Sequence, residues 1–310
     1  MSCRNGSRPL SLIKPLSIAD LITKEFPPQP VWIGPDILPK SCKLLWGGEA
    51  KIGKSHGIIE IGRGLALGES PFDCPLFNVP RPASVLLVEH ELKPYGLHKR
   101  VKKALGDIDE SRRKKMEFNY ISGEHTINFS SPEGRKLLED IIKDYRPEIL
   151  MLDPISKMHN FDENSNTEIG RMYAYLDSLI DYGKSWGMSI IMSHHFGKPP
   201  TIKSDREALD AYNFRGAAKF KDDPDVLITA IRSCFLPTPH VSWRLRTRWI
   251  TRHDESPPDI FLNVNENNDL RVKYHGTEAV TGGLPPAQGV PKIVPPPTNV
   301  ASCGGISTYD

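Results

Sequence analysis

The sequence predicts an α/β domain with a mostly parallel central sheet, flanking helices and a C-terminal β meander. Short apolar runs rich in β-branched residues alternate along the chain with longer segments of helical period, as in α/β folds. Several of these runs are apolar at nearly every position, which is typical of parallel strands buried on both faces. After the last of them, alternating segments are joined by polar turns, the pattern of an antiparallel meander.

The expected elements follow from these runs and from local start signals. Buried strands are expected at residues 42–47, 84–89, 148–153, 189–194 and 226–231. Helices are expected at residues 54–67, at 133–143 behind the pair Ser131-Pro132, and at 168–186. The meander is expected at residues 241–250, 260–264 and 270–274.

Proline marks the boundaries of the folded part. Five of the thirteen residues at 27–39 are proline, so we expect an extended arm there that leads into the first strand. From about His275 onward the chain is rich in proline and glycine, which predicts a disordered tail or one that binds a partner. The predicted division is an N-terminal arm at 1–31, a folded domain at 32–274 and a proline-rich tail at 275–310.

Composition excludes several classes of protein. Lys and Arg number 40 against 38 Asp and Glu, so net charge predicts neither a nucleic-acid nor an acidic partner. The five cysteines are widely spaced and no pair has the spacing of a zinc half-site, so reduced structural thiols are expected. Because no apolar run approaches membrane-spanning length and the first residues lack a secretory signal, we expect a cytoplasmic protein with no membrane partner.

One motif carries most of the chemical information. The residues at 48–55, GEAKIGKS, match the phosphate-loop pattern GxxxxGK[ST] between an apolar strand and a helical segment. Glycines let backbone amides close around phosphate oxygens, and the helix N-terminus adds a partial positive charge. Lys54 is then expected to reach the β- and γ-phosphates of ATP, and the Ser55 hydroxyl to bind Mg²⁺. A glycine-rich turn that binds nothing is the alternative, and the flanking strand and helix disfavour it. The predicted nucleotide-binding residues are Gly48, Glu49, Ala50, Lys51, Ile52, Gly53, Lys54, Ser55 and His56.

A carboxylate follows the strand expected at 148–153. The apolar run ends in Asp153, the Walker B pattern for a residue that holds Mg²⁺ through water at the carboxyl edge of the sheet. The alternative is an aspartate that only caps the turn before Pro154. We therefore predict Ser55 and Asp153 as the metal-site residues.

Two more carboxylates end another strand. The run VLLV is followed by Glu89, His90 and Glu91, and period-two alternation places the two glutamates on the same side. We choose Glu91 as the residue that activates water because it lies just beyond the strand. Glu89 is then a buried group or one that faces Mg²⁺ from farther away. At the end of the strand at 189–194, His194 or His195 could contact the γ-phosphate, and the alternative is a histidine with only a structural role.

Five segments, in this order, resemble the RecA-like ATPases of the RepA-type hexameric helicase group. They are GGEAKIGKS, VLLVEHE, EILMLDP with FDENSN after it, IIMSHHFGK and NFRGAAKF, and the resemblance covers residues 32–274. The phosphate loop is common to NTPases in general, whereas the double histidine followed by Lys198 and the later Arg-Gly pair are typical of this group. The resemblance implies a RecA-like fold and a Mg²⁺-dependent ATPase.

The same resemblance implies roles for individual residues. Glu91 matches the catalytic glutamate, and His194 matches the residue that couples the γ-phosphate to a DNA-facing loop. Arg215 matches the arginine supplied to the ATP of a neighbouring subunit, so it should lie away from its own phosphate loop. The segment after it, AAKFKDDPD, is more charged than is usual in the family, and Arg232 is the competing candidate for this role.

The resemblance also implies partners. It suggests a hexameric ring that moves along single-stranded DNA as a helicase in the replication of a phage, plasmid or other mobile element. Two other functions fit the same motifs: a RecA- or RadA-like recombination or repair ATPase that forms filaments, and a nucleotide-dependent regulatory switch that binds a protein partner. The proline-rich tail is a candidate docking segment for a replication partner of the helicase or for the protein partner of the switch.

Three basic segments are candidates for contact with DNA. The loop at 197–206 carries Lys198, Lys203 and Arg206, at a position that resembles the DNA-contacting loop of RecA-like rings. In the segment at 243–249, WRLRTRW, the arginines and tryptophans alternate, and we favour a core face of Trp and Leu with a solvated basic face, because stacking on bases needs aromatics on the charged face. The basic run at 98–115 falls on a helix and turn, where a solvated face is expected.

Overall fold

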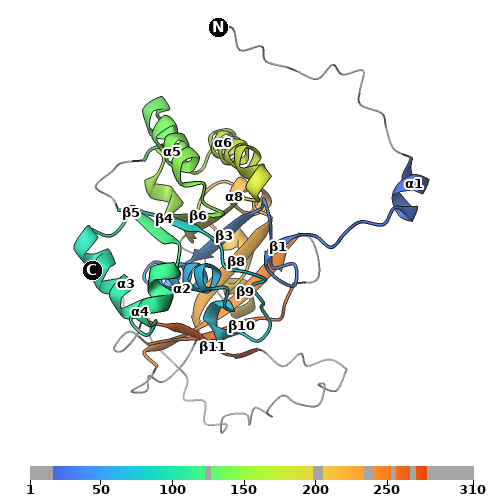
Figure 1. Cartoon of the computed structure of the whole chain (residues 1–310). Coiled ribbons are helices and arrows are strands. Elements are labelled where there is room, and N and C mark those ends of the chain that lie inside the picture. The colour runs from blue at the N-terminus through green and yellow to red at the C-terminus, as the bar shows by residue number, and fades with distance from the viewer. Residues whose placement is uncertain are drawn as a thin grey trace. The chain divides into compact units, whose positions relative to one another are not determined.

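A nine-stranded sheet organises the described part of the chain, in the order β11-β10-β9-β8-β3-β7-β6-β4-β5 (Figure 1). The structure, a computed structural model, describes residues 17–122, 127–197, 205–233, 241–252, 256–265 and 270–277. These residues belong to one unit, 1–278, and the second unit, 279–310, lies outside them. The six strands from β5 to β8 pair in parallel, and β9 to β11 continue as an antiparallel meander. The predicted fold class is therefore confirmed.

The strands of the sheet agree closely with the sequence prediction. Their bounds are β3 Lys43–Gly48, β4 Val85–Glu89, β5 Phe118–Ser122, β6 Ile149–Asp153, β7 Ser189–His195, β8 Val226–Ser233, β9 Trp243–Thr251, β10 Ile260–Val264 and β11 Val272–Thr277. Only β5 was not predicted, because it is an edge strand whose residues are mostly exposed or half-buried. Since β11 ends at Thr277, the folded part extends three residues past the expected boundary at 274.

Alternation along the strands divides the core between two faces of the sheet. In β3, Trp46 belongs to one apolar cluster and its neighbour Leu45 to the other. Helix α2 (Lys54–Leu67) packs into the first cluster, whereas α5 (Pro132–Tyr145) and α6 (Asn166–Gly183) pack into the second (Figure 1). The parallel strands are thus covered on both faces, which explains why their sequences are apolar throughout.

The helices begin where the sequence places its caps. The side chain of Ser131 accepts a hydrogen bond from the Gly134 backbone at the start of α5, and Ser165 does the same for Glu168 in α6. The other helices are shorter: α1 Ile18–Thr23, α3 Pro94–Ala104, α4 Glu110–Lys115, α7 Asp205–Ala208 and α8 Lys219–Asp222. Within the described ranges, every helix is too short or too polar to cross a lipid bilayer.

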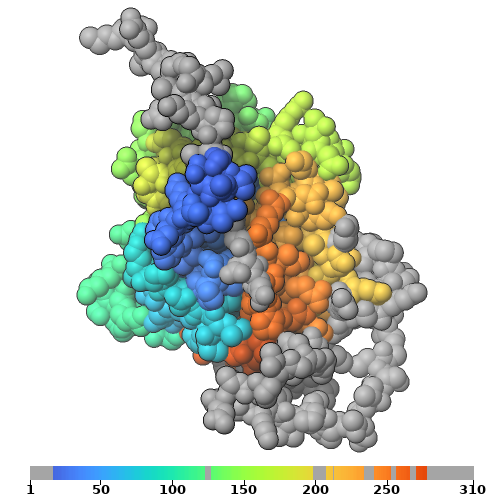
Figure 2. All heavy atoms as spheres, turned by 90° about the vertical axis from the view of Figure 1, so that its right-hand side faces the viewer, coloured from blue at the N-terminus to red at the C-terminus, as the bar shows by residue number. Residues whose placement is uncertain are grey.

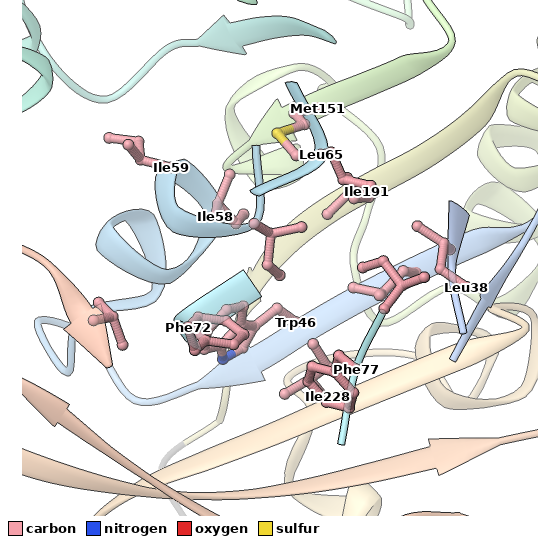
Figure 3. Packing of buried hydrophobic residues seen from close by; sticks show 14 of the residues in the cluster. Leu38, Trp46, Ile58, Ile59, Leu65, Phe72, Phe77, Met151, Ile191 and Ile228 are labelled. Carbon is pink, nitrogen blue, oxygen red and sulfur yellow. The ribbon is translucent and has the colours of Figure 1, made fainter. Parts of the chain in front are cut away.

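The proline-rich stretch at 27–39 differs from the expected arm. Its second half forms a small antiparallel sheet of β1 (Val31–Ile33) and β2 (Leu38–Pro39), and both Trp32 and Leu38 are buried. The indole N–H of Trp32 donates to the Gly187 carbonyl at 2.8 Å. The arm prediction was wrong here because four apolar residues in the stretch pack into the first core cluster, where Figure 3 shows Leu38.

Aromatic side chains join the parallel half of the sheet to the meander. Figure 3 shows Trp46 of β3 next to Phe72. The two rings pack edge-to-face with centroids 6.0 Å apart, and the Phe77 ring lies 4.8 Å from the Trp249 ring on β9. In the space-filling view the segment after α2 (cyan) borders the strands of the meander (orange) (Figure 2). Through these contacts the segment after α2 packs against both β3, which leads into the phosphate loop, and β9 of the meander.

An ion-pair network also fastens α2 to the residue before β11. The Arg271 guanidinium donates to both carboxylate oxygens of Glu60, at 2.8–3.0 Å, and also to Asp107 at 2.7 Å. Both partners of the Arg271–Glu60 pair are buried, so neither charge has water to replace the other. Helix α2, which begins at the phosphate-loop lysine, is thereby held at its middle.

Candidate functional site

The phosphate loop connects β3 to α2 and has the backbone that its glycines predict. A Cβ on Gly48 would lie 2.4 Å from the Ile52 side chain and 2.9 Å from the Ala230 carbonyl, so only glycine fits there. Gly53 has φ +111°, which strains any residue with a side chain. Its carbonyl accepts from the Gly57 amide at 3.0 Å and so begins the helix. The loop lies at the carboxyl edge of the parallel strands.

Lys54 is buried under this loop. Its ammonium donates to the carbonyls of Gly48 at 2.9 Å and Glu49 at 2.7 Å, and lies 3.2 Å from Nδ1 of His195. Burial lowers the pKa of Lys54 to about 8, an effect that the nearby Asp153 charge opposes. Lys54 is thus held against the loop whose backbone N–H groups would donate hydrogen bonds to phosphate oxygens.

Asp153 and Glu89 lie side by side at the ends of β6 and β4, as register partners in the sheet. Asp153 Oδ1 accepts from the Ser193 hydroxyl, and Glu89 Oε1 accepts from the amides of Glu91 at 2.6 Å and Leu92 at 2.9 Å. The second oxygen of each carboxylate is buried and has no hydrogen-bond partner among the described residues. Burial raises the pKa of Asp153, and burial together with the Asp153 charge raises the pKa of Glu89 to about 7.

The unpartnered carboxylate oxygens of Asp153 and Glu89 are suitable ligands for a cation. Oxygen ligands are the ones that Mg²⁺ prefers, and Ser55, the other predicted metal-site residue, lines the same cavity as Asp153. In the described ranges no cluster of three or more His, Cys, Asp or Glu side chains could hold a metal by itself. The donor set therefore suits Mg²⁺ that brings nucleotide phosphates and water as its remaining ligands.

The two glutamates after β4 have different surroundings. Glu89 is 1% exposed, and its carboxylate holds the turn that follows the strand. Glu91 is exposed and lines the cavity described below. The structure thus places Glu89 as a group that positions Glu91, and the choice of Glu91 as the residue that activates water stays a prediction.

The two adjacent histidines at the end of β7 point in opposite directions. His194 is fully buried, its ring stacks on Phe220 with centroids 4.1 Å apart, and its Nε2 lies 3.0 Å from the Arg215 carbonyl. Burial lowers the pKa of His194 to about 4, so it is neutral. His195, half-buried, is the one that approaches Lys54. The prediction that His194 contacts the γ-phosphate is therefore corrected: alternation along β7 turns its neighbour to the phosphate loop instead.

A cavity of about 940 Å³ opens over the phosphate loop. Its far wall consists of the loop after β6 and the turn before α8, which carry Glu163 and Arg215. Arg215 Nε lies 3.2 Å from Glu163 Oε2, and the Ala217 amide donates to the Glu163 carbonyl at 2.6 Å. Gly216, at φ +95°, is needed because a Cβ would lie 2.2 Å from that same carbonyl.

Arg215 differs in position from the sequence expectation. It lines the same cavity as the phosphate loop of its own chain, whereas the resemblance implied a place away from it. The physical reason is the end of β7: the Arg215 amide donates to the His195 carbonyl at 3.2 Å, which holds the turn against the strand. Arg232, the competing candidate, instead packs its guanidinium over the Trp243 ring at 4.9 Å.

Three further cavity residues were not recognised in the sequence. Arg100 reaches the cavity from α3, His159 from the loop after β6, and Trp243 from the start of β9. Arg100 belongs to the basic run at 98–115, where nothing in the sequence separates it from its basic neighbours. His56, which was predicted, also lines the cavity, and burial lowers its pKa to about 4.

The structure describes only some of the basic segments that were candidates for contact with DNA. On β9, Arg246 and Arg248 pair with Asp259 at 2.8 and 3.0 Å, and Arg244 donates to Asn263, while Leu245 and Trp249 are buried. This agrees with the preferred interpretation of a core face with a polar reverse side. Lys198, Lys203 and the side chain of Arg206 lie outside the described residues, as does the tail from 278.

Comparison with known proteins identifies the family. The model of one protein family, the AAA domain, matches residues 7–201, which is more than half of the chain. The chain belongs to this family. It is a RecA-like P-loop ATPase, as its phosphate loop and parallel sheet indicate. One similar solved structure is the flagellar accessory protein FlaH from Methanocaldococcus jannaschii, with 12% identity and a TM-score of 0.49 over 77% of this chain and 91% of that one. No curated protein matches the ATPase chain significantly.

Proposed function

We propose that the chain hydrolyses ATP in the cavity over the phosphate loop, with Mg²⁺ as cofactor. The observation that carries this proposal is the convergence of Lys54, Asp153 and Glu91 from three different segments on one cavity at the carboxyl edge of the sheet. A volume of about 940 Å³ lies within the range of ligand sites, roughly 300–1,000 Å³.

Each residue has a defined task in this mechanism. Lys54 exchanges its loop carbonyls for the β- and γ-phosphate oxygens, and Ser55 and Asp153 hold the metal. Bound Mg²⁺ would supply positive charge to the phosphates during transfer. Glu91 orients and polarises the attacking water, and Glu89 fixes the turn from which Glu91 extends. His195 adds a hydrogen-bonding group beside Lys54, and Arg215 adds donors from the other side of the cavity.

We further propose that hydrolysis drives movement along single-stranded DNA, as a helicase in the replication of a phage, plasmid or other mobile element. The order of the five motif segments supports this assignment, and so does the chain connection from the site to the basic loop. His195 lies beside Lys54, and Lys198 follows three residues later. A homo-oligomeric ring, hexameric by the resemblance, and a cytoplasmic location belong to the same proposal.

DNA-stimulated phosphate release tests the proposal. We expect single-stranded DNA to raise the rate and DNA affinity to fall with salt, by a slope of about −0.7 per neutralised phosphate on logarithmic axes. Replacing both Lys198 and Lys203 by Ala should make that slope shallower. Turnover without DNA stimulation would favour the regulatory switch, and electron microscopy separates closed rings from the filaments of a recombination or repair ATPase.

A further inference from the structure

The tryptophan at the start of β9 is bonded directly to the phosphate loop. The indole Nε1 of Trp243 donates to the Ile52 carbonyl at 2.8 Å, across 191 positions of sequence. The ring also lies over Gly53, because a Cβ there would approach it at 3.5 Å. The guanidinium of Arg232 packs over the same ring, 4.9 Å from its centroid. The Arg232–Trp243 pair, from the adjacent strands β8 and β9, thus lies at one peptide of the phosphate loop.

The orientation of the Ile52–Gly53 peptide matters for phosphate binding. The Ile52 carbonyl and the Gly53 N–H belong to the same planar trans peptide, so they point in opposite directions. A donor that anchors the carbonyl therefore turns the Gly53 N–H away from the indole. Gly53 lacks a Cβ and has a left-handed φ of +111°, so the loop alone does little to hold this orientation. Backbone N–H groups of phosphate loops are the groups that cradle phosphate oxygens.

We propose that Trp243 is a positioning residue that holds the Ile52–Gly53 peptide in the orientation needed to bind nucleotide phosphates, and that Arg232 steadies the indole ring. The proposal deepens the proposed function, since it concerns the same phosphate site, but it does not depend on DNA. The phosphate loop is then preorganised by the antiparallel half of the sheet as well as by its own glycines.

The test uses a pair of matched substitutions in the full chain. Trp243→Phe keeps an aromatic ring under Arg232 and removes the indole N–H together with part of the indole ring system. Trp186→Phe is the control, because the Trp186 indole also donates to a carbonyl, that of Pro147 at 2.9 Å, and also carries an arginine over its ring, Arg146 at 5.6 Å. Trp186 lies just before β7, at the opposite edge of the sheet from the phosphate loop.

Calorimetric binding of Mg-ADP and of inorganic pyrophosphate gives the decisive readout. For Trp243→Phe we expect the dissociation constant of both ligands to rise about two- to tenfold, the effect of one lost neutral hydrogen bond. Trp186→Phe should bind both ligands like the wild type, although the two variants lose similar thermal stability. Pyrophosphate has no base, so a rise seen with ADP alone would mean that Trp243 contacts the base, and this would overturn the positioning role.

Unchanged binding of both ligands by Trp243→Phe would also overturn it. Should that variant fail to fold, Arg232→Met decides the question. It keeps the indole N–H and should raise both dissociation constants by a smaller factor, so an unchanged affinity would count against the proposal. If the wild-type chain itself binds neither ligand, the proposed function fails instead, so the two failures are distinguishable.

Discussion

The two walls of the nucleotide cavity are built in different ways. The near wall consists of the phosphate loop and the ends of β4, β6 and β7, and its key side chains are buried, with Lys54 at 6% and Asp153 at 2% exposure. The far wall consists of irregular segments joined by a backbone hydrogen bond and by an ion pair in which the Arg215 side chain is 65% exposed. Regular elements fix the first wall before nucleotide binds, whereas the second can respond to it.

This difference leads to the largest expected effect, at the near wall. Lys54→Ala removes a buried ammonium that the loop holds at two carbonyls. Because the phosphates lose this partner both on binding and during transfer, we expect ATP hydrolysis to fall by more than about 10⁴. Phosphate release measures it, with Lys136→Ala, an exposed lysine of α5 outside the cavity lining, as the control. Near-normal turnover of Lys54→Ala would refute the proposed site.

The second substitution separates the two glutamates after β4. Glu91→Gln should keep ATP binding and lower hydrolysis by about 10²- to 10⁴-fold, because an amide cannot accept a proton from water as a carboxylate does. Glu89→Gln should cost less, since the amide oxygen can still accept from the backbone of Glu91 and Leu92. Single-turnover rates measure both, and a reversed ranking would transfer the role of activating water to Glu89.

A third substitution concerns the far wall. Arg215→Ala should bind ATP and hydrolyse it about 10²- to 10³-fold more slowly, the usual effect of losing one donor to a developing charge. Since Arg215 lines the cavity of its own chain, mixing these subunits with Lys54→Ala subunits should restore no activity. Recovery of activity at intermediate mixing ratios would show that Arg215 acts across an interface, as the resemblance implied.

The near wall was predictable from sequence because its chemistry is local. The pattern GxxxxGK[ST] and apolar runs that end in carboxylates are set by consecutive residues, and β3 and α2 lie where these patterns place them. The far wall depends on tertiary contacts. Arg215 lines the cavity of its own chain because its backbone amide donates a hydrogen bond to the His195 carbonyl, a contact that no spacing in the sequence encodes.

The remaining differences have the same origin. Trp243 and Arg100 enter the cavity from elements that the motifs do not include, and their neighbours in sequence have the same residue types. Which histidine of the pair faces Lys54 depended on one residue of strand register, since a shift by one reverses both side chains. The proline content led to the prediction of an extended arm at 31–39, whereas the apolar residues between these prolines pack into the core.

A fourth prediction concerns Glu89, a buried carboxylate of the near wall, and the dependence of folding stability on pH. Burial and the charge of Asp153 raise the pKa of Glu89 from 4.5 to about 7. The folded chain then binds a proton that the unfolded chain releases, so stability falls as pH rises between about 4.5 and 7. Without nucleotide, the wild type should lose a few kcal/mol relative to Glu89→Gln across this range, measured by denaturant unfolding. A difference independent of pH would mean that the glutamate is ionised throughout.

The smallest effect is expected at the ion pair between the two segments of the far wall. Glu163→Gln removes the ion pair with Arg215 but keeps the Glu163 carbonyl, which accepts from the Ala217 amide, so the backbone of the turn should stay in place. Because the Arg215 side chain is 65% exposed, water screens the pair even though Glu163 is only 17% exposed, and the pair contributes no more than about 1 kcal/mol. Without the carboxylate, Arg215 is free to pair with phosphate, and one negative charge leaves the cavity. Nucleotide should therefore bind about two- to fivefold more tightly at low salt, with the gain shrinking as ionic strength rises. Calorimetric titration of Mg-ADP measures this, and Glu133→Gln, an exposed glutamate of α5 outside the cavity lining, is the control. Weaker binding by Glu163→Gln would mean that the ion pair preorganises Arg215 instead of competing with nucleotide, and the far wall would then be as fixed as the near one.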